Sequence, residues 1–212
     1  MARPAKKCQT LPAPCEVSDT SAEGAEATIR TSLREAAQLL TGFPDAQIAL
    51  IARAAALMTD ALRAGRKIIW FGNGGSATQS QHMAAEFVGR FRAERRSLPS
   101  LSLTENMASV TAIGNDYAFD QIFSRQLEGL AQPGDVAVAL STSGNSPNVL
   151  AGLRTAARLA LGTVGLTGHS GGAMPALCEI CIVVPSTVTA RIQEAHLVIG
   201  HLLCGLAEDA LK

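Results

Sequence analysis

The stretch Leu140-Ser141-Thr142-Ser143-Gly144-Asn145-Ser146 decides the fold of this chain. A short apolar run over residues 135–140 indicates a buried strand, and residues 147–159 indicate a helix that follows the stretch. Four hydroxyls and a glycine therefore lie on a strand-to-helix turn, where unpaired N–H groups and the helix dipole favour an anion. The turn has no lysine, so it is not the P-loop of a nucleotidase. It predicts a phosphorylated small molecule held by neutral donors.

Length, charge and hydropathy narrow the class of protein. The chain has 212 residues, of which 47% are apolar, and this suits one globular domain with a substantial core. The formal net charge is zero, so we expect no nucleic-acid partner. No apolar run reaches the roughly 18 residues of a membrane span. The first residues are basic, but the apolar segment of a signal peptide does not follow them, so we expect no signal peptide. We therefore expect no membrane partner.

The chain has five cysteines, and this odd number favours reduced thiols and a cytoplasmic location. Cys178 and Cys181 have CxxC spacing, but a zinc ribbon needs a second pair nearby. A redox CxxC motif should open a helix, whereas Cys181 begins a run that indicates a strand. We expect buried structural cysteines here. Cys8 and Cys15 fall in a proline-rich leader, which we expect to be a flexible tail. A metal or redox role for these two cysteines is the alternative.

Apolar periodicity predicts alternating strands and helices after a disordered leader at residues 1–24. Residues 25–212 are expected to form one domain that begins with two helices. The expected helices are 25–40, 48–62, 77–91, 107–113, 118–130, 147–159 and 188–211, and the strands are 67–71, 101–103, 136–140, 163–166 and 180–184. This alternation implies an α/β fold with a parallel sheet covered on both faces.

A second glycine-rich turn, Gly72-Asn73-Gly74-Gly75-Ser76, follows the first expected strand. Two such turns imply a ligand crevice at the carboxyl edge of the sheet. Taken alone, the second turn is also consistent with a tight connection between a strand and a helix, without a ligand.

Two of the expected helices carry side chains that suit a metal or a proton transfer. His82 and Glu86 are four residues apart and share one helix face. Gln193 and His201 are eight apart, within roughly 80° around their helix. Together they would form a nitrogen and oxygen cluster for a divalent metal such as zinc, or a base and an acid. The alternatives are a surface contact between His82 and Glu86, and a structural role for His201 in the core.

These motifs resemble the sugar isomerase (SIS) domain family, most closely its bacterial sedoheptulose-7-phosphate isomerases. The resemblance covers residue 25 to the C-terminus. Five motifs in the right order carry it, at residues 72–76, 82–91, 113–117, 141–148 and 192–201. It implies a flavodoxin-like parallel sheet flanked by helices, a homotetramer with active sites between subunits, and one zinc ion per subunit.

The implied reaction is a ketose–aldose isomerisation. It converts sedoheptulose 7-phosphate to glycero-manno-heptose 7-phosphate through an enediol, an early step of nucleotide-activated heptose biosynthesis. The resemblance implies Glu86 as the base and His201 as the acid. Its metal positions are His82, Glu86, Gln193 and His201. Its substrate positions are Asn73, Gly74, Gly75, Ser76, Glu86, Asn115, Asp116, Ser141, Thr142, Ser143, Ser146 and Gln193.

One position departs from the family pattern, because Ala190 stands where some relatives carry an acidic residue. Two other functions belong to proteins with the same domain. A non-catalytic SIS scaffold that binds a replication initiator lacks the acid and the base, whereas this chain keeps Glu86 and His201. A sugar-phosphate-sensing regulator needs a DNA-binding helix-turn-helix domain, which the short leader does not supply.

Overall fold

The computed structural model of the protein describes residues 22–212. The leader expected at residues 1–24 thus lies outside the described residues except for its last three, which are helical. Helix α1 (Ala22–Thr41) begins three residues before the expected start. The chain divides into two compact units, Met1–Glu35 and Ala36–Lys212. In the first unit, the apolar side chains of Ile29 and Leu33 are exposed.

The sheet of the second unit has five parallel strands in the order β2-β1-β3-β4-β5. This is the flavodoxin-like order, and it confirms the expected fold class. The strands are β1 (Ile68–Gly72), β2 (Ser100–Ser102), β3 (Val136–Ser141), β4 (Gly162–Thr167) and β5 (Ile180–Val183). Gly72 pairs with Leu140, so β1 and β3 end at the same level. The strand order reverses between these two strands, and ligands of such sheets bind at this switch point.

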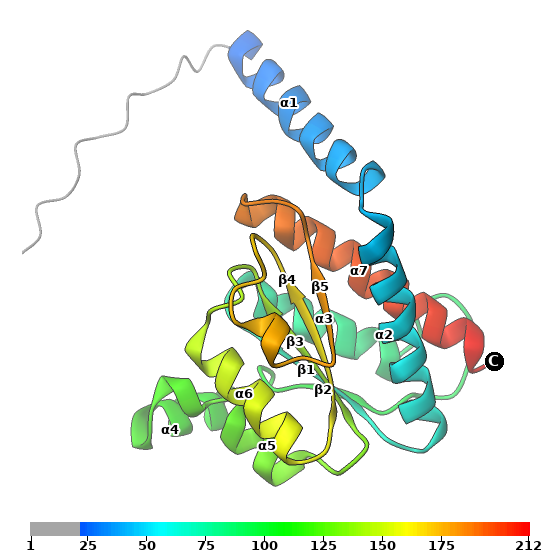
Figure 1. Ribbon diagram of the computed structural model, residues 1–212, viewed down its shortest axis with the longest axis vertical. Coiled ribbons are helices and arrows are strands. Elements are labelled where there is room, and N and C mark those ends of the chain that lie inside the picture. Colours follow the sequence, from blue (N-terminus) through cyan, green and yellow to red (C-terminus); the bar gives the residue numbers. More distant parts are fainter. Residues whose placement is uncertain (1–21) are drawn as a thin grey trace, which may run out of the picture. The chain divides into compact units, whose positions relative to one another are not determined.

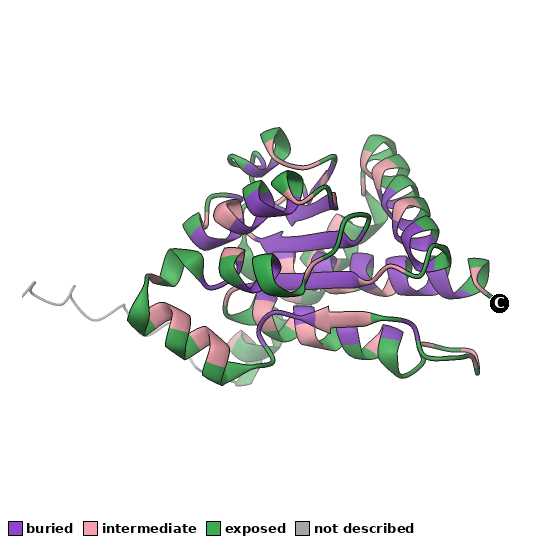
Figure 2. Ribbon diagram, turned by 90° about the horizontal axis from the view of Figure 1, so that it is seen from below, coloured by how far each residue is buried: buried purple, intermediate pink, exposed green. Residues whose placement is uncertain are grey.

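Helices cover both faces of the sheet (Figure 1). Ile68 and Trp70 of β1 belong to one core cluster, shared with α2 (Asp45–Arg63), α3 (Gly75–Val88) and α7 (Thr189–Ala210). The alternate residues Ile69 and Phe71 belong to a second cluster, with α5 (Ser124–Leu130) and α6 (Pro147–Arg158). Figure 2 shows the central strands buried between these layers, whereas the edge strand β2 is mostly of intermediate burial. Alternating side chains of one strand therefore fill two separate cores.

Several expected boundaries were wrong. The expected helix 118–130 is a short 3-10 turn, η1 (Phe119–Gln121), followed by α5, because the adjacent Ile122 and Phe123 are both buried. The expected helix 77–91 ends at Val88. Asn115 and Asp116, expected in a loop, form the last turn of α4 (Met107–Asp116). Within residues 22–212, no helix is both long and apolar enough to cross a membrane.

One titratable side chain lies deep in the larger core. His196 on α7 is 1% exposed, and its Nε2 atom lies 3.2 Å from the carbonyl oxygen of Thr167. Its Nδ1 atom has no hydrogen-bond partner among the described residues. Burial lowers the pKa of His196 from 6.5 to about 4, although the bond to Thr167 opposes this change. The imidazole is therefore neutral in the folded protein at pH values where the unfolded chain protonates it.

We predict that this histidine makes the protein less stable in acid. The unfolded chain binds a proton below pH 6.5, whereas the folded chain binds it only near pH 4. The free energy of unfolding should therefore fall by about 3 kcal/mol between these pH values. Urea unfolding from pH 7 to pH 4 measures the slope. His196→Gln should flatten it, and the exposed His169→Gln should not; equal slopes in the two variants would contradict the prediction.

Candidate active site

The hydroxyl-rich turn joins the end of β3 to the start of α6. The Oγ atom of Ser141 lies 3.0 Å from that of Ser146 and 3.5 Å from that of Ser143, so three hydroxyls converge. Gly144 has a φ of 65°, and a side chain there would overlap the carbonyl group of Gly171. Only glycine fits this position without a shift of the backbone. The turn thus presents clustered hydroxyl donors at a helix N-terminus.

A neighbouring loop holds the backbone of this turn in place. The Gly168 N–H donates to the Thr142 carbonyl oxygen over 3.1 Å. The Ala173 N–H lies 3.0 Å from both the Gly144 carbonyl oxygen and the Asn145 Oδ1 atom. The loop after β4 therefore fixes the shape of the turn before any ligand binds.

The glycine-rich turn after β1 is tied to both neighbouring helices. The side-chain amides of Asn73 and Asn148 exchange two hydrogen bonds of 2.8 Å, which join the β1 turn to α6. Gly74 has a φ of 57°, which favours glycine. A Cβ atom at Gly75 would lie 2.6 Å from the Gln193 Nε2 atom, so the start of α3 approaches α7 closely.

His82, Glu86 and His201 form one group between α3 and α7. The His82 Nε2 atom lies 3.0 Å from the Glu86 Oε1 atom and 3.3 Å from the His201 Nε2 atom. One ligand atom from each side chain lies within 4.8 Å of the others. Gln193 lies eight residues before His201 on α7, and its carbonyl oxygen accepts a 2.7 Å hydrogen bond from Gln79. The structure thus brings three of the four expected metal ligands together.

A buried carboxylate fixes the loop that follows α3. Glu208 on α7 accepts hydrogen bonds from three consecutive backbone N–H groups, at residues 91–93, and from the guanidinium of Arg95. Its side chain is 1% exposed. Burial alone would raise the pKa of Glu208, but these donors lower it below its usual value. Helix α3 ends at Val88 with Gly89 as its C-cap. The three N–H groups that follow bond this carboxylate rather than a further helical turn.

This loop contacts the group of three residues directly. The ring of Phe91 stacks on the ring of His201, with centroids 5.4 Å apart. The Arg95 guanidinium donates to the carbonyl oxygen of Glu86 over 2.8 Å. Glu208 and Arg95 therefore position Phe91 and the end of α3. Neither residue belongs to the group of His82, Glu86 and His201.

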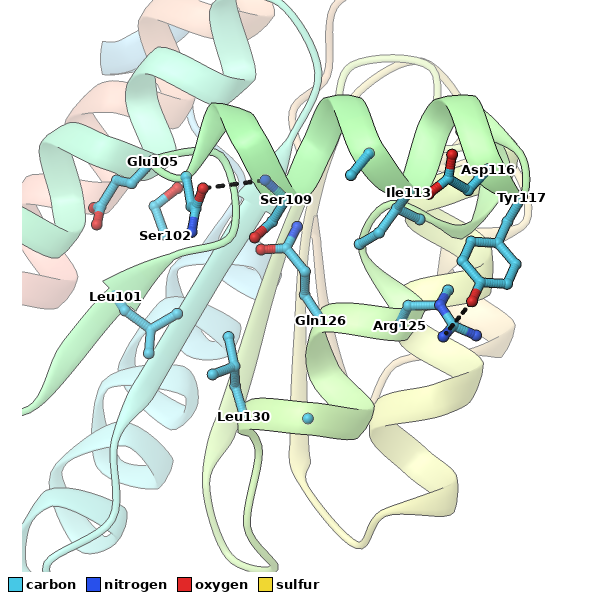
Figure 3. A pocket seen from close by; sticks show the side chains of 13 residues that line it. Leu101, Ser102, Glu105, Ser109, Ile113, Asp116, Tyr117, Arg125, Gln126 and Leu130 are labelled. Atoms are coloured by element: carbon cyan, nitrogen blue, oxygen red, sulfur yellow. Dashed lines mark hydrogen bonds between the residues drawn. The ribbon is translucent and has the colours of Figure 1, made fainter.

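The expected sugar contacts lie in different places. Asn115 and Asp116 are exposed at the end of α4, where their side chains share a 2.8 Å hydrogen bond. Asp116 lines a cavity of about 550 Å³, together with Tyr117 and Arg125 (Figure 3). The described residues around this cavity include none from the hydroxyl-rich turn.

A smaller cavity of about 200 Å³ lies at the glycine-rich turn. Gly72, Asn73 and Gly74 line it together with Met107 and Val110 from the first half of α4. Ser76, also expected at the substrate, is buried beneath the turn. Residues along the whole of α4, from its N-cap Asn106 and Ser109 to Asp116, border the larger cavity, whereas Met107 and Val110 border the smaller one.

Sequence reasoning missed Glu208, Arg95, Phe91 and the pairing partner Asn148. A signal for Glu208 existed, because it lies four residues after Cys204, on the buried face of α7. An acidic residue at a core position needs donors nearby. The sequence did not show that the backbone of residues 91–93 supplies them.

Comparisons with known proteins bear on the class of this chain. The SIS domain family model matches residues 33–168. The phosphoheptose isomerase of Rhodospirillum rubrum is 55% identical over 161 residues, which are 76% of this chain and 86% of that protein. The phosphoheptose isomerase of Aquifex aeolicus is 45% identical over 181 residues, 85% of this chain and 95% of that protein.

Two solved structures share the whole architecture. The phosphoheptose isomerase of Neisseria gonorrhoeae has a TM-score of 0.82 at 35% identity, covering 87% of this chain and 99% of that one. The enzyme from Francisella tularensis has a TM-score of 0.84 at 34% identity, covering 87% and 98%. The chain therefore belongs to the SIS domain family and, within it, to the phosphoheptose isomerases. All four relatives are isomerases by name, which favours an enzyme over the scaffold.

We predict that a methyl group at Gly200 separates α3 from α7. A Cβ atom there would overlap the Met83 Sδ atom and lie 3.0 Å from its Cγ atom, and Met83 is buried. Gly200→Ala should lower the free energy of unfolding by about 1–3 kcal/mol through overpacking, despite the better helix propensity of alanine. Urea unfolding measures this change.

Gly129→Ala is the matched control. Gly129 also lies in a helix, and a Cβ atom there has no neighbour within 4 Å. This change should raise stability by up to about 1 kcal/mol, because only helix propensity acts. If both variants gained stability, the close contact at Gly200 would not constrain the two helices.

Proposed function

We propose that this protein interconverts sedoheptulose 7-phosphate and glycero-manno-heptose 7-phosphate through an enediol, as an early step of nucleotide-activated heptose biosynthesis. The observation that carries the proposal is the pairing of a hydroxyl-rich turn at the sheet's switch point with a carboxylate and two imidazoles between α3 and α7. The names of the relatives supply the substrate class.

The turn between β3 and α6 would hold the phosphate. The hydroxyls of Ser141, Thr142, Ser143 and Ser146 donate to its oxygens, and the N-terminus of α6 favours its charge. This group lies far from the reacting carbons, so its binding energy serves to orient the sugar. For the sugar itself we propose contacts with Asn73, Gly74, Gly75, Ser76 and Gln193. We place the active sites between subunits, so that Asn115 and Asp116, which lie at the end of α4, would contact the sugar bound to a neighbouring subunit.

Glu86 and His201 would move the protons. A carboxylate at Glu86 takes the carbon-bound proton, and His201 protonates the carbonyl oxygen. The stacked ring of Phe91 restricts the orientation of the His201 imidazole. The Nε2 atom of His82 contacts both residues, at 3.0 Å and 3.3 Å, and so holds the base and the acid close together.

The same residues fit a zinc ion. Two nitrogen ligands about 2.0–2.1 Å from a tetrahedral zinc ion lie about 3.3 Å apart. The Nε2 atoms of His82 and His201 lie at that distance. We propose that these two residues, Glu86 and Gln193 hold one ion per chain. A ligating atom cannot carry a proton at the same moment, so Glu86 and His201 would alternate between ligation and proton transfer. The chemistry that such an ion supplies when bound is polarisation of the substrate carbonyl.

A coupled assay of sedoheptulose 7-phosphate isomerisation, with and without added zinc, tests this function. Elemental analysis of the purified protein should find about one zinc per chain, and a chelator should remove both the metal and the activity. Absence of turnover on any ketose phosphate, in the metal-loaded protein, would refute the isomerase. Full activity in a chelator would refute the zinc site alone.

We predict that two substitutions separate binding from chemistry. Ser143→Ala removes one charge-assisted hydrogen bond, worth about 1.5–3 kcal/mol, so KM should rise roughly 10- to 150-fold. Glu86→Gln keeps the shape but removes the base, so kcat should fall by about 10²–10⁴-fold. Steady-state kinetics of both variants measure this. Near-normal turnover in Glu86→Gln would rule out its role as the base, and unchanged KM in Ser143→Ala would rule out the phosphate site.

We propose a homotetramer in the cytoplasm, with residues 25–212 as its folded part. An apolar stripe on α7, formed by Val198, Leu202 and Leu206, is exposed at 38%, 47% and 46%. It borders a cavity of about 330 Å³ lined by these three residues and Ile199 of α7, by apolar side chains of α2 and the preceding loop, and by Leu40 of α1. A second chain that covers the stripe would remove this surface from water. The buried residues of α7 pack against the larger core cluster of the same chain.

Leu202→Glu should break the tetramer, because it places a charge in the centre of the stripe. Light scattering at micromolar concentration should then give a smaller species. Leu130→Glu is the control, since Leu130 is 49% exposed but lies on α5, on the other face of the sheet. A monomeric parent protein, or a Leu202→Glu variant of unchanged size, would contradict the assembly.

A further inference from the structure

Outside the proposed active site, the thiols of Cys178 and Cys181 meet over Gly165. Gly165 of β4 pairs with Cys181 of β5, so side chains at the two positions leave the sheet on the same face. A Cβ atom at Gly165 would lie 2.8 Å from the Cys178 Sγ atom and 3.2 Å from the Cys181 Sγ atom. The missing side chain thus leaves a space into which both sulfur atoms point.

Both thiols are more accessible than the sequence indicated. We expected a buried structural pair; both side chains are only half-buried and pack against the second core cluster, whereas Cys204 is buried. Cys181 lies on β5, which is an edge strand of the sheet. The chain bends at Glu179, where the N–H donates to the Thr163 hydroxyl over 2.9 Å. This bend returns Cys178 to the side of the sheet that Cys181 occupies.

The two sulfur atoms have unequal chemistry. A hydrogen bond from the Cys178 thiol lowers the pKa of Cys181, although burial opposes this. The same bond, together with burial, raises the pKa of Cys178. The thiolate is the reactive form of cysteine. Because Cys181 lies on the edge strand and accepts the hydrogen bond, it is the nucleophile of the pair, and Cys178 is the resolving thiol. Redox CxxC motifs usually lower the thiol pKa with a helix N-terminus instead.

We propose that Cys178 and Cys181 form a redox-active dithiol that hydrogen peroxide closes to a disulfide. The Cys181 thiolate attacks one peroxide oxygen, the O–O bond breaks, and a sulfenic acid and hydroxide result. The Cys178 sulfur then attacks the sulfenic sulfur, the S–S bond forms, and the oxygen leaves as water. Two thiols lose two electrons and two protons, and one peroxide becomes two waters. Two molecules of a low-molecular-weight thiol then reduce the disulfide by thiol–disulfide exchange and are themselves oxidised to a disulfide.

The pair is connected to the hydroxyl-rich turn. Only the short turn η2 (Met174–Ala176) and Leu177 separate Cys178 from Ala173, whose N–H donates to Gly144 and Asn145. Closing the disulfide constrains this segment at one end. The consequence for phosphate affinity rests on the proposed function, whereas the disulfide itself does not.

Peptide mass spectrometry of the full chain tests the proposal. The reduced protein is treated with one equivalent of hydrogen peroxide, denatured, alkylated and cut with trypsin. Peptide 159–191 contains Cys178 and Cys181 and no other cysteine. It should lose the mass of two hydrogen atoms and escape alkylation, and a thiol reductant should restore two alkylation sites. Cys204, whose pKa burial raises to about 12, should stay reduced in the same sample.

Single variants assign the two roles. In Cys178→Ser, a sulfenic-acid probe should label Cys181 after peroxide, because no resolving thiol remains. In Cys181→Ser, Cys178 should stay unlabelled. Full alkylation of both cysteines after peroxide, or oxidation of Cys204 at the same rate, would overturn the proposal. Equal labelling of the two variants would overturn the assignment of the nucleophile.

Discussion

The close approach of α3 and α7 is the constraint on which the site depends. Gly75 and Gly200 have no side chains, so Gln193 and Met83 pack directly against the backbone of the opposite helix. This close packing brings the Nε2 atom of His82 to 3.3 Å from the Nε2 atom of His201. Side chains on two helices can reach one another for proton transfer only where the helices pack closely. The core and the chemistry therefore share one set of packing contacts.

The parallel sheet places the second half of the site. Because β1 and β3 are neighbours in the order and end level with each other, their two turns meet at the switch point. The amide pair of Asn73 and Asn148 then fixes one turn against the other. A turn rich in hydroxyls binds an anion with little rearrangement when its backbone is already held. The bonds from Gly168 and Ala173 provide that support.

The sequence predicted the features that arise from local pattern. Strand-helix alternation fixed the fold class, and the spacing of His82 and Glu86 placed them on one face. Contacts between distant segments were not predictable in the same way. Gly89, which follows Val88, is a local stop signal that the expected bounds overlooked. The hydrogen bonds from residues 91–93 to Glu208 span 115 to 117 residues, and no pattern near residue 91 encodes them. The accessible thiols at Gly165 were missed because edge position and register decide their exposure, whereas composition does not.

Helix α7 shows why a uniformly apolar pattern has several meanings. Its residues Ile192, Ile199 and Leu203 are buried in the core, while Val198, Leu202 and Leu206 are exposed in a stripe. Between these faces it carries His201, and near its end the buried Glu208. Core packing and loop support therefore occupy the buried face of this helix, whereas the assembly and the proton transfer that we propose use its other sides. A single substitution on this helix separates those roles only when it changes one face, so the position around the axis matters more than the residue type.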